Sequence, residues 1–578
     1  MPGLFFVYAG SGPMPPWQTP TLECLLRAPI PSTVAAMSRY YLTTPIYYVN
    51  DKPHIGHCFT TCFADVVARF QRLFGREVFF LTGTDEHADK VVSTAAEHGM
   101  SPMQWADTNA RAFEQAFAAL NISNDDFIRT TQPRHTTKVL EYIAALQKRG
   151  DIYLGDYTGW WDPSQEEYLT ETTAKDASYK SPVTGKDLVK RTERNYFFKL
   201  SAYHDRLVEH LARNPEFILP ESRRNEVLGR LRERLVDIPI SRGITDDPSS
   251  QWGIRMPEDA THRIYVWIDA LFNYLSVIDT DEKQDFWPPS AHLLAKDILW
   301  FHAVIWPCLL MALGRPLPGT VYAHGYFVRD GRKMSKSLGN FIDLAVINQY
   351  CAKYSADAFR WFLATQGPIG NNDADFSHTK FIEVYNADLA NGIGNAISRV
   401  GNMCDKYFNG TVPDAKGVSS LPGLADFDWP SIISRHVASA IGKADALDIT
   451  GALQEGVLLV KKVDAYINVT EPFKLAKKIA PGSDESPERD RLAAILYHCA
   501  EALRVATLLH SPAIPTAAAK VQTAWHCLPA AGATLAQQTQ WNGAHSLVPG
   551  APLTKGEILF MRAEPGPLNP DEPTPGAA

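Results

Sequence analysis

The sequence predicts an α/β fold, a parallel sheet that is split by a long insertion and followed by an all-α bundle. Apolar, strand-like runs at 40–44 and 78–81 flank a stretch in which Phe63, Val66, Val67, Phe70 and Leu73 recur at helical spacing. Gly75 then provides a stop signal for that helix. A strand, helix, strand order implies parallel pairing, with a ligand site at the carboxyl ends of the strands.

The later segments give the rest of this architecture. Strand-like runs recur at 264–268 and 320–324, so we expect the sheet to be interrupted by the residues between its two halves. From about residue 381 to 561 the pattern changes to long helical stretches, broken by Pro and Gly near 409–430 and 480–487, which indicates a separate helical bundle. Residues 564–578 hold five prolines and no periodicity, which is typical of a disordered tail.

Length and composition exclude several classes of protein. A chain of 578 residues predicts three or four domains, because single cores stop growing near roughly 250 to 300 residues. Hydrophobic content of 45% with 21% charged residues is typical of a soluble globular protein, and no apolar run approaches the roughly 20 residues that cross a bilayer. The net charge of −8 gives no global attraction for nucleic acid, so any such partner requires a local basic patch.

The N-terminus and the cysteines bear on localisation. Residues 1–38 are poor in charge and rich in Pro, and we favour a start codon placed too early, with the true start at Met37, over an organelle transit peptide. The eight cysteines form no CxxC pair and indicate free thiols in a reducing compartment. We therefore expect a cytoplasmic protein, with an organelle as the alternative if residues 1–38 are a transit peptide.

Two short segments carry chemistry. His54-Ile55-Gly56-His57 lies in the turn between the first strand and its helix, where backbone N–H groups and the helix dipole attract anions. Two imidazoles three residues apart can bind phosphate oxygens, and Gly56 lacks the Cβ that would keep a nucleotide away. Alone, this segment is more often accidental than functional.

The second segment is Lys333-Met334-Ser335-Lys336-Ser337, on a loop flanked by Gly331 and Gly339. Two lysines with intervening hydroxyls suit a clamp on a polyphosphate, which supplies positive charge as negative charge develops in the transition state. A solvated basic loop would be the simpler explanation if this segment stood alone.

Together, in this order and on either side of a split sheet, the two segments resemble the signature pair of class I aminoacyl-tRNA synthetases. Residues 41–90, 265–270 and 296–302 resemble the methionyl-tRNA synthetases in particular, a likeness that extends from about residue 39 to 562. The resemblance implies a Rossmann-like catalytic domain and a methionine–tRNA ligase, with methionine, ATP, Mg²⁺ and tRNA(Met) as substrates and partners. It also implies a monomer, since the chain ends without the C-terminal module that dimerises some relatives.

The resemblance also implies roles for individual residues. It assigns ATP binding to His54, Gly56, His57, Lys333, Ser335 and Lys336, of which His54, His57, Lys333 and Lys336 would serve catalysis. It assigns the methionine pocket to Ile46, Tyr48, Asp85, Trp267, Ala270, Tyr274 and His302, with Asp85 pairing the substrate ammonium. In the bundle, Phe473 and Lys474 would contact tRNA, with Phe473 stacked on an anticodon base and lysines around it. Plain core packing is the alternative for Phe473.

The insertion departs from the family pattern. Relatives with zinc knuckles have CxxC pairs where this chain reads GWWDPSQEE (159–167) and ASYKSPVTG (177–185). We therefore expect no zinc, and an insertion held by side-chain packing. The expected ranges are an extension (1–38), the first half of the catalytic domain (39–120), the connective insertion (121–240), the second half with the lysine loop (241–340), a connector (341–380), an anticodon-binding helical domain (381–562) and a tail (563–578).

Two other functions are weaker candidates. A cysteine-specific synthetase is also compact, but those enzymes recognise their substrate through a zinc thiolate site whose ligands are missing here. A tRNA-binding protein built on an inactive synthetase would have damaged signatures, whereas both signatures are intact.

Overall fold

The computed structural model describes residues 38–164, 167–169, 171–329, 331–334, 341–479, 486–566 and 568, nearly all of them in the second of two units, Arg39–Ala578. Residues 1–37 of the predicted N-terminal extension and three residues of the lysine loop, Ser335, Lys336 and Ser337, lie outside the described residues. So does most of the predicted tail, although Asn386 Nδ2 donates to the Ala563 carbonyl at 2.8 Å and Lys353 Nζ to the Leu568 carbonyl at 2.8 Å.

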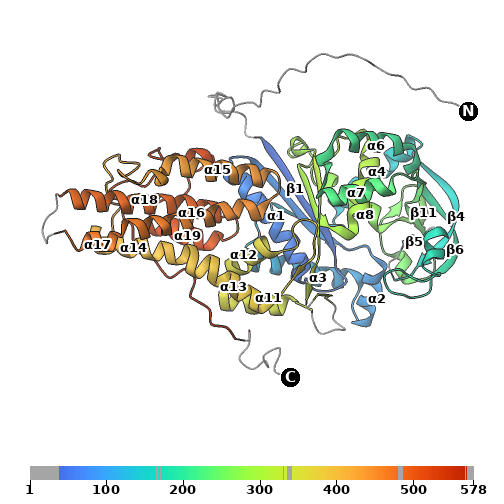
Figure 1. Cartoon of the computed structure of the whole chain (residues 1–578). Helices are drawn as coiled ribbons and strands as arrows, with labels where there is room; N and C mark the ends of the chain where they lie inside the picture. The colour runs from blue at the N-terminus through green and yellow to red at the C-terminus, as the bar shows by residue number, and fades with distance from the viewer. Residues whose placement is uncertain are drawn as a thin grey trace, which may run out of the picture. The chain divides into compact units, whose positions relative to one another are not determined.

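A six-stranded parallel sheet forms the centre of the described α/β region, and the predicted fold class is confirmed. Its order is β3 (Asp126–Arg129), β2 (Glu77–Asp85), β1 (Arg39–Tyr48), β12 (Ala291–Ala295), β13 (Thr320–His324) and β7 (Ile218–Leu219). Helix α1 (Ile55–Leu73) connects β1 to β2 and packs beside them (Figure 1). Strands β3 and β7 both come from the range 121–240, so the main sheet draws on residues that we had placed in the insertion.

One predicted strand is wrong. The main sheet contains no strand at 264–268, because β11 (Asp259–Ile264) ends there and α8 (Val266–Leu271) begins two residues later. The strand that pairs with both β1 and β13 is β12, which the sequence reading did not identify. A five-residue apolar run is compatible with a strand or with a buried helix, and periodicity cannot distinguish them.

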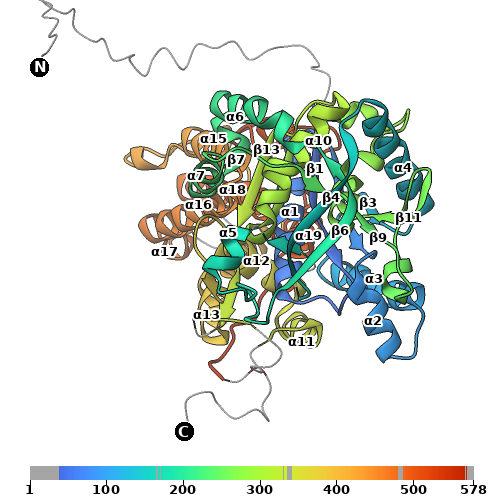
Figure 2. The ribbon, with the colours of Figure 1, turned by 90° about the vertical axis from the view of Figure 1, so that its right-hand side faces the viewer.

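The insertion contains an antiparallel sheet of order β5 (Glu167–Leu169), β4 (Ile152–Asp162), β6 (Val189–Phe198) and β8 (Ile238–Pro239). Strands β4 and β6 form a long ribbon in Figure 2. Cations cover its tryptophans: Lys190 Nζ lies 5.4 Å from the ring centre of Trp160, and the Arg242 guanidinium lies 5.3 Å from that of Trp161. Such pairs support the prediction that side-chain packing holds this region.

Shorter elements complete the α/β region. They are α2 (Asp89–Glu97), α3 (Pro102–Ala119), α4 (Pro133–Lys148), α5 (Glu171–Asp176), α6 (His204–Arg213), α7 (Glu221–Arg230), α9 (Asn273–Ser276), η7 (Phe301–Ile305) and α10 (Trp306–Leu313), with two small sheets, β10 (Arg255–Met256), β11 and β9 (Ser241–Gly243), and β15 (Arg332–Lys333), β14 (Phe327–Arg329) and β16 (Ala374–Asp375).

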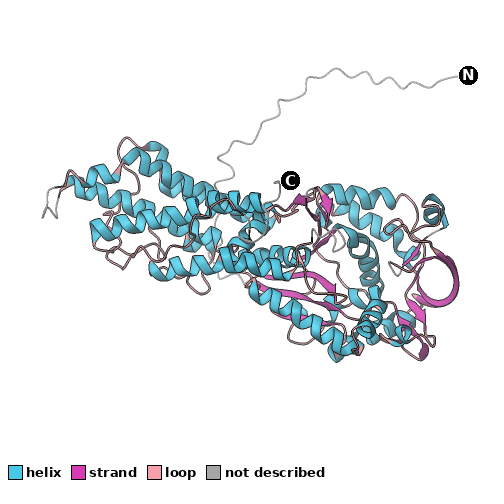
Figure 3. Ribbon diagram, turned by 90° about the horizontal axis from the view of Figure 1, so that it is seen from below, coloured by secondary structure: helices cyan, strands magenta, loops and turns pink. Residues whose placement is uncertain are grey.

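The C-terminal region is helical, as Figure 3 shows. It comprises α11 (Leu344–Tyr354), α12 (Ala356–Gln366), α13 (His378–Val384), η9 (Tyr385–Gly394), α14 (Asn395–Phe408), α15 (Trp429–Asp445), α16 (Ile449–Thr470), α17 (Pro472–Ala476), α18 (Pro487–His510), α19 (Pro515–Ala524) and α20 (Leu535–Gln538). By length and composition α18 is apolar enough to cross a membrane, the one such helix among the described residues, but its apolar window is wholly buried. Core packing therefore accounts for its composition.

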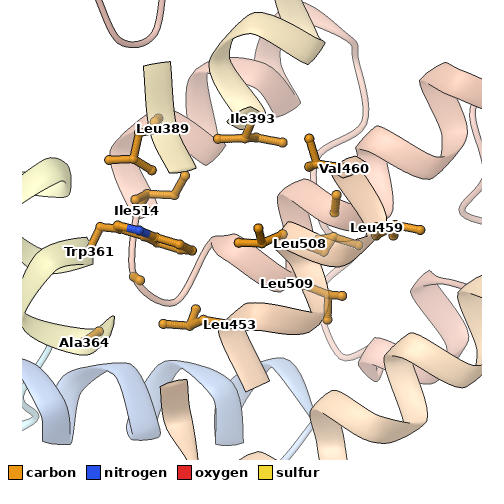
Figure 4. Packing of buried hydrophobic residues seen from close by; sticks show 14 of the residues in the cluster. Trp361, Ala364, Leu389, Ile393, Leu453, Leu459, Val460, Leu508, Leu509 and Ile514 are labelled. Atoms are coloured by element: carbon orange, nitrogen blue, oxygen red, sulfur yellow. The ribbon is translucent and has the colours of Figure 1, made fainter. Parts of the chain in front are cut away.

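Helix α12 joins the bundle to the α/β region. Figure 4 shows Trp361 and Ala364 of α12 within one apolar cluster with Leu453 of α16 and Leu508 of α18. Arg360, which directly precedes Trp361 on the same helix, is fully buried. Its Nη2 lies 2.7 Å from Asp65 Oδ2 of α1.

The Arg360 guanidinium also donates from Nε, Nη1 and Nη2 to backbone carbonyls. These nitrogens bond the carbonyls of Leu120 (2.9 Å), Pro512 (2.7 Å) and Ala513 (3.1 Å), so that one guanidinium links α1, the end of α3 and the turn after α18. Burial alone would raise the pKa of Asp65, but Arg360 and Arg69 together hold it below its ordinary value.

We predict that Arg360→Met lowers the free energy of unfolding by roughly 3 to 5 kcal/mol, because it leaves the Asp65 carboxylate buried without its main cation. The double variant Asp65→Asn with Arg360→Met should recover part of that loss, since no uncompensated charge remains. Urea denaturation measures the stability of both variants. As a control, Arg213→Met breaks an exposed salt bridge, whose arginine side chain is 72% exposed, and should leave the urea midpoint unchanged. A double variant less stable than Arg360→Met would contradict this explanation.

Candidate active site

The N-terminus of α1 places both histidines of the first signature side by side. His54 is the N-cap, and the ring centres of His54 and His57 lie 3.9 Å apart. His54 Nδ1 accepts from the Gly56 N–H at 3.0 Å, and His57 Nδ1 accepts from the His54 N–H at 3.3 Å. A Cβ on Gly56 would lie 2.9 Å from the His54 ring, so glycine is required for this fold-back.

These contacts determine the protonation of both rings. Burial lowers the pKa of His54 to about 4, and burial together with His54 lowers the pKa of His57 well below its ordinary value. Both imidazoles are therefore neutral near pH 7. Because each Nδ1 accepts a backbone N–H, the proton of each ring is on Nε2, which makes Nε2 a hydrogen-bond donor.

The described residues that flank the second signature are held in place, and those that follow it contact the first signature. Strand β15 pairs with β14, so Lys333 faces Val328 across the ladder. Beyond the loop, the Ile55 N–H donates to the Ile342 carbonyl at 3.0 Å, and the Phe341 ring centre lies 4.9 Å from that of His54. The segments on both sides of the lysine loop are thereby anchored, the second of them directly on the N-terminus of α1.

An aromatic cluster forms beside the end of β1. The rings of Tyr48 and Trp267 meet edge to face at 5.7 Å, and Trp267 stacks on Phe301 at 4.1 Å. Ile46, two residues before Tyr48, packs against the neighbouring core, and Ala270 follows Trp267 by one helical turn on α8. Flat apolar rings suit a polarizable thioether.

Tyr274 and His302 form a second pair, in which His302 directly follows Phe301 of the cluster in the sequence. The Tyr274 hydroxyl lies 2.7 Å from His302 Nε2, and His302 Nδ1 lies 2.9 Å from the Ile298 carbonyl. A carbonyl only accepts, so His302 carries its proton on Nδ1 and accepts from Tyr274 at Nε2. Burial lowers the pKa of His302 to about 4. The pair is neutral and fully bonded.

Asp85 occupies the carboxyl end of β2, opposite Tyr48 of β1, and is 3% exposed. Its neighbour Glu86 is completely buried and accepts from Arg129 Nε at 2.7 Å and from the Thr131 hydroxyl. The carboxylate that we assign to the substrate ammonium therefore lies in a firmly anchored segment.

Comparisons with known proteins agree with this geometry. The family model described as tRNA synthetases class I (M) matches residues 40–178 and 173–401. The chain belongs to this family of methionyl-tRNA synthetases. It is 40% identical over 546 residues to a methionine–tRNA ligase of Streptomyces coelicolor, covering 91% of this chain and 97% of that one. A second methionine–tRNA ligase, of Caldanaerobacter subterraneus, is 40% identical over 532 residues, with 91% of this chain and 79% of that one covered.

Solved structures of the family give the same result. The methionyl-tRNA synthetase of Mycobacterium tuberculosis in complex with methionyl-adenylate is similar with a TM-score of 0.81 at 34% identity, covering 91% of this chain and all of that one. Its free form is similar with a TM-score of 0.77 at 33% identity, covering 92% of this chain and all of that one.

Sequence reasoning missed part of the site of this synthetase. Phe301 lies within the segment 296–302 and could have been noticed as a ring beside His302. His292 had no local signal; its ring lies 4.4 Å from that of Tyr274, and its Nδ1 lies 2.6 Å from the Thr43 hydroxyl.

The proposed tRNA contact lies at the surface of the bundle. Phe473 of α17 is 39% exposed, so it is not the core residue that the alternative explanation required. Lys474 pairs with Glu471 at 2.6 Å, and Lys462 Nζ lies 4.7 Å from the Phe427 ring centre.

Away from these residues, the described part of the chain has a cavity but no cluster suited to a metal ion. No group of three or more His, Cys, Asp or Glu side chains is placed to hold a metal ion among the residues that the structure describes. A cavity of about 510 Å³, lined by residues that include Arg206, His210 and Arg315, lies at the connection that enters β13 at its amino end. The cavity therefore lies at the amino ends of the strands, whereas the candidate site lies at their carboxyl ends.

The lowered pKa of His302 predicts a pH dependence of stability. A histidine with a folded pKa of about 4 and an ordinary value of 6.5 contributes stability that is complete above 6.5 and is lost as the pH falls toward 4. When the pH is lowered from 7 to 5, His302 should reduce the free energy of unfolding of the wild type by roughly 2 kcal/mol. His302→Gln should lose less over that interval, as measured by urea midpoints at both pH values, and identical pH dependence of the two proteins would contradict the assignment.

Proposed function

We propose that the chain is a methionine–tRNA ligase, which activates methionine with ATP and transfers it to the 3′ end of tRNA(Met). One observation carries this most directly. The segment after the lysine loop is hydrogen-bonded to the N-terminus of α1. There the His57 ring meets that of Tyr47 edge to face at 4.9 Å, and the next residue, Tyr48, meets Trp267. A phosphate site and a thioether site therefore lie beside each other at the ends of the same strands.

In the first step the methionine carboxylate attacks the α-phosphate of ATP, the bond to the β-phosphate breaks, and pyrophosphate leaves. The Nε2–H groups of His54 and His57 donate to phosphate oxygens, while Lys333, Ser335 and Lys336 bind the pyrophosphate. Neutral imidazoles orient the phosphates, and the lysines neutralise the charge that develops. Asp85 pairs the ammonium and fixes the carboxylate for attack.

In the second step a ribose hydroxyl of the terminal adenosine attacks the carbonyl carbon of the adenylate, and AMP leaves. Mg²⁺ suits this chemistry as a partner of ATP oxygens, because it needs few protein ligands and no carboxylate cluster stands ready for it in the described residues.

Zinc does not suit the insertion, which lacks CxxC pairs. The free thiols of the described cysteines support a reducing compartment such as the cytoplasm, and we propose a monomer.

Pyrophosphate exchange tests the proposed function. Each amino acid is supplied in turn with ATP, Mg²⁺ and labelled pyrophosphate, and methionine should give the highest kcat/KM. Exchange that is faster with cysteine or a branched amino acid would overturn the specificity, and no exchange with any amino acid would overturn the activity.

Lys336→Ala should lower the rate of methionine-dependent exchange by at least about tenfold, because a lost transition-state contact costs roughly 2.7 to 4 kcal/mol in comparable sites. The KM for methionine should barely change. Lys380→Ala removes an exposed lysine of α13 that lies 3.8 Å from Glu383, and it should exchange at the wild-type rate. Wild-type exchange by Lys336→Ala would remove the lysine from the clamp.

The anticodon contact rests on Phe473. Its ring is partly exposed just after Pro472, and Lys461, Lys462, Lys474, Lys477 and Lys478 lie near it in sequence. An aromatic surface within a local positive patch is what an acidic protein requires in order to bind RNA. The bundle would then read tRNA while the sheet carries out the chemistry.

Phe473→Ala should weaken tRNA charging by on the order of 5- to 150-fold, because stacking is worth roughly 1 to 3 kcal/mol per base. Pyrophosphate exchange, which needs no tRNA, should stay near normal. Leu528→Ala truncates another exposed apolar residue, 68% exposed, and should leave charging unchanged. Charging at the wild-type rate by Phe473→Ala would exclude the residue from the tRNA site.

A further inference from the structure

Two histidines from different elements converge on one buried carboxylate behind the methionine pocket. His87 Nδ1 lies 2.6 Å from Asp269 Oδ2, and His135 Nε2 lies 2.8 Å from Asp269 Oδ1. His87 follows β2, His135 belongs to α4 and Asp269 belongs to α8. All three are buried.

The directions of these hydrogen bonds follow from the carboxylate. Burial alone would raise the pKa of Asp269, but His87 and His135 hold it at about 2, so the group is ionised and only accepts. His87 must therefore carry a proton on Nδ1 and His135 on Nε2. On its far side, His135 Nδ1 lies 2.9 Å from the Ser276 hydroxyl of α9.

Asp269 lies between the residues that shape the pocket. It is two residues after Trp267 and one before Ala270, and Ser276 is two residues after Tyr274. His87 is two residues after Asp85. The hydrogen bonds of Asp269 therefore connect the segment that holds the ammonium ligand to the helix that holds the thioether contacts.

Both residues that follow Asp85 are held by hydrogen bonds. Glu86 is held by Arg129 and Thr131 on one side, and His87 is held by Asp269 on the other. The bond from His87 to Asp269 is a direct hydrogen bond between α8 and the segment that follows β2, so it constrains their separation. Separation matters here because a misplacement of about 1 Å in a site can cost on the order of 100-fold.

We propose that Asp269 is a positioning residue for amino-acid selection, which uses the paired N–H groups of His87 and His135 to set the distance between Asp85 and the Trp267–Ala270 wall. The inference rests on the proposed function and deepens it. Asp269 acts through its neighbours and does not contact the substrate.

The two histidines allow a matched set of variants. His135 donates from Nε2, which a glutamine amide can imitate, and His87 donates from Nδ1, which an asparagine amide can imitate. His135→Ala and His87→Ala should raise the KM for methionine at least roughly tenfold while changing the KM for ATP less than twofold. His135→Gln and His87→Asn should restore most of the methionine KM.

Specificity provides a second readout. The ratio of kcat/KM for methionine to that for ethionine, which is one methylene longer, should fall in both alanine variants and recover in the amide variants. Ser276→Ala removes only the hydroxyl that faces His135 and should show a milder form of the same effect, which keeps the test available if an alanine variant fails to fold.

The control is a similar cluster in the bundle. His436 Nδ1 lies 2.6 Å from Glu455 Oε2, so His436→Ala also breaks a buried carboxylate–imidazole contact. It should lower the melting temperature without changing the methionine KM in pyrophosphate exchange. Equal methionine KM values in the alanine and amide variants, or a loss of stability with no change in KM or in the ethionine ratio, would overturn the positioning role. Wild-type exchange with methionine tests the proposed function separately, so the two failures are distinguishable.

Discussion

The buried pair of Arg360 and Asp65 is the constraint on which the rest of the structure depends. Asp65 lies on α1, whose N-terminus carries His54 and His57, and Arg360 lies on α12 at the border of the bundle. Two buried charges are costly to remove from water, and they are tolerated here because carbonyls and Arg69 satisfy the remaining donors and acceptors. The direction of α1, and with it the phosphate site, is thus fixed by groups that the bundle also contacts.

The site itself is built from neutral imidazoles and a few isolated charges. His54, His57 and His302 are all buried and keep pKa values below their ordinary range, so they contribute directed hydrogen bonds and no net charge. We propose that the positive charge on the polyphosphate comes from the lysines of the loop. Of the carboxylates here, Asp85 is the one that we assign to the ammonium, Glu86 is paired with Arg129, and Asp269 faces two histidines.

Contiguous features could be predicted from the sequence, and contacts between distant segments could not. The strand, helix, strand unit, the first signature and the helical bundle each depend on local spacing, and the described residues contain them. The run at 264–268 was misassigned because five apolar residues suit a strand or a buried helix equally well. Arg360 and the Asp269 cluster carry no local pattern at all: His87 and His135 are far apart in the chain, and only the fold brings them to the same carboxylate.

The most direct test of the central claim identifies the amino acid that the protein attaches to RNA. The protein is incubated with ATP, Mg²⁺, a tRNA(Met) transcript and an equimolar mixture of the standard amino acids, and the 3′-terminal nucleoside is analysed by mass spectrometry. We predict an ester of methionine on the terminal adenosine, formed only when ATP is present. An ester of another amino acid, or an unmodified 3′ end with a transcript that a known methionine–tRNA ligase charges, would contradict the account.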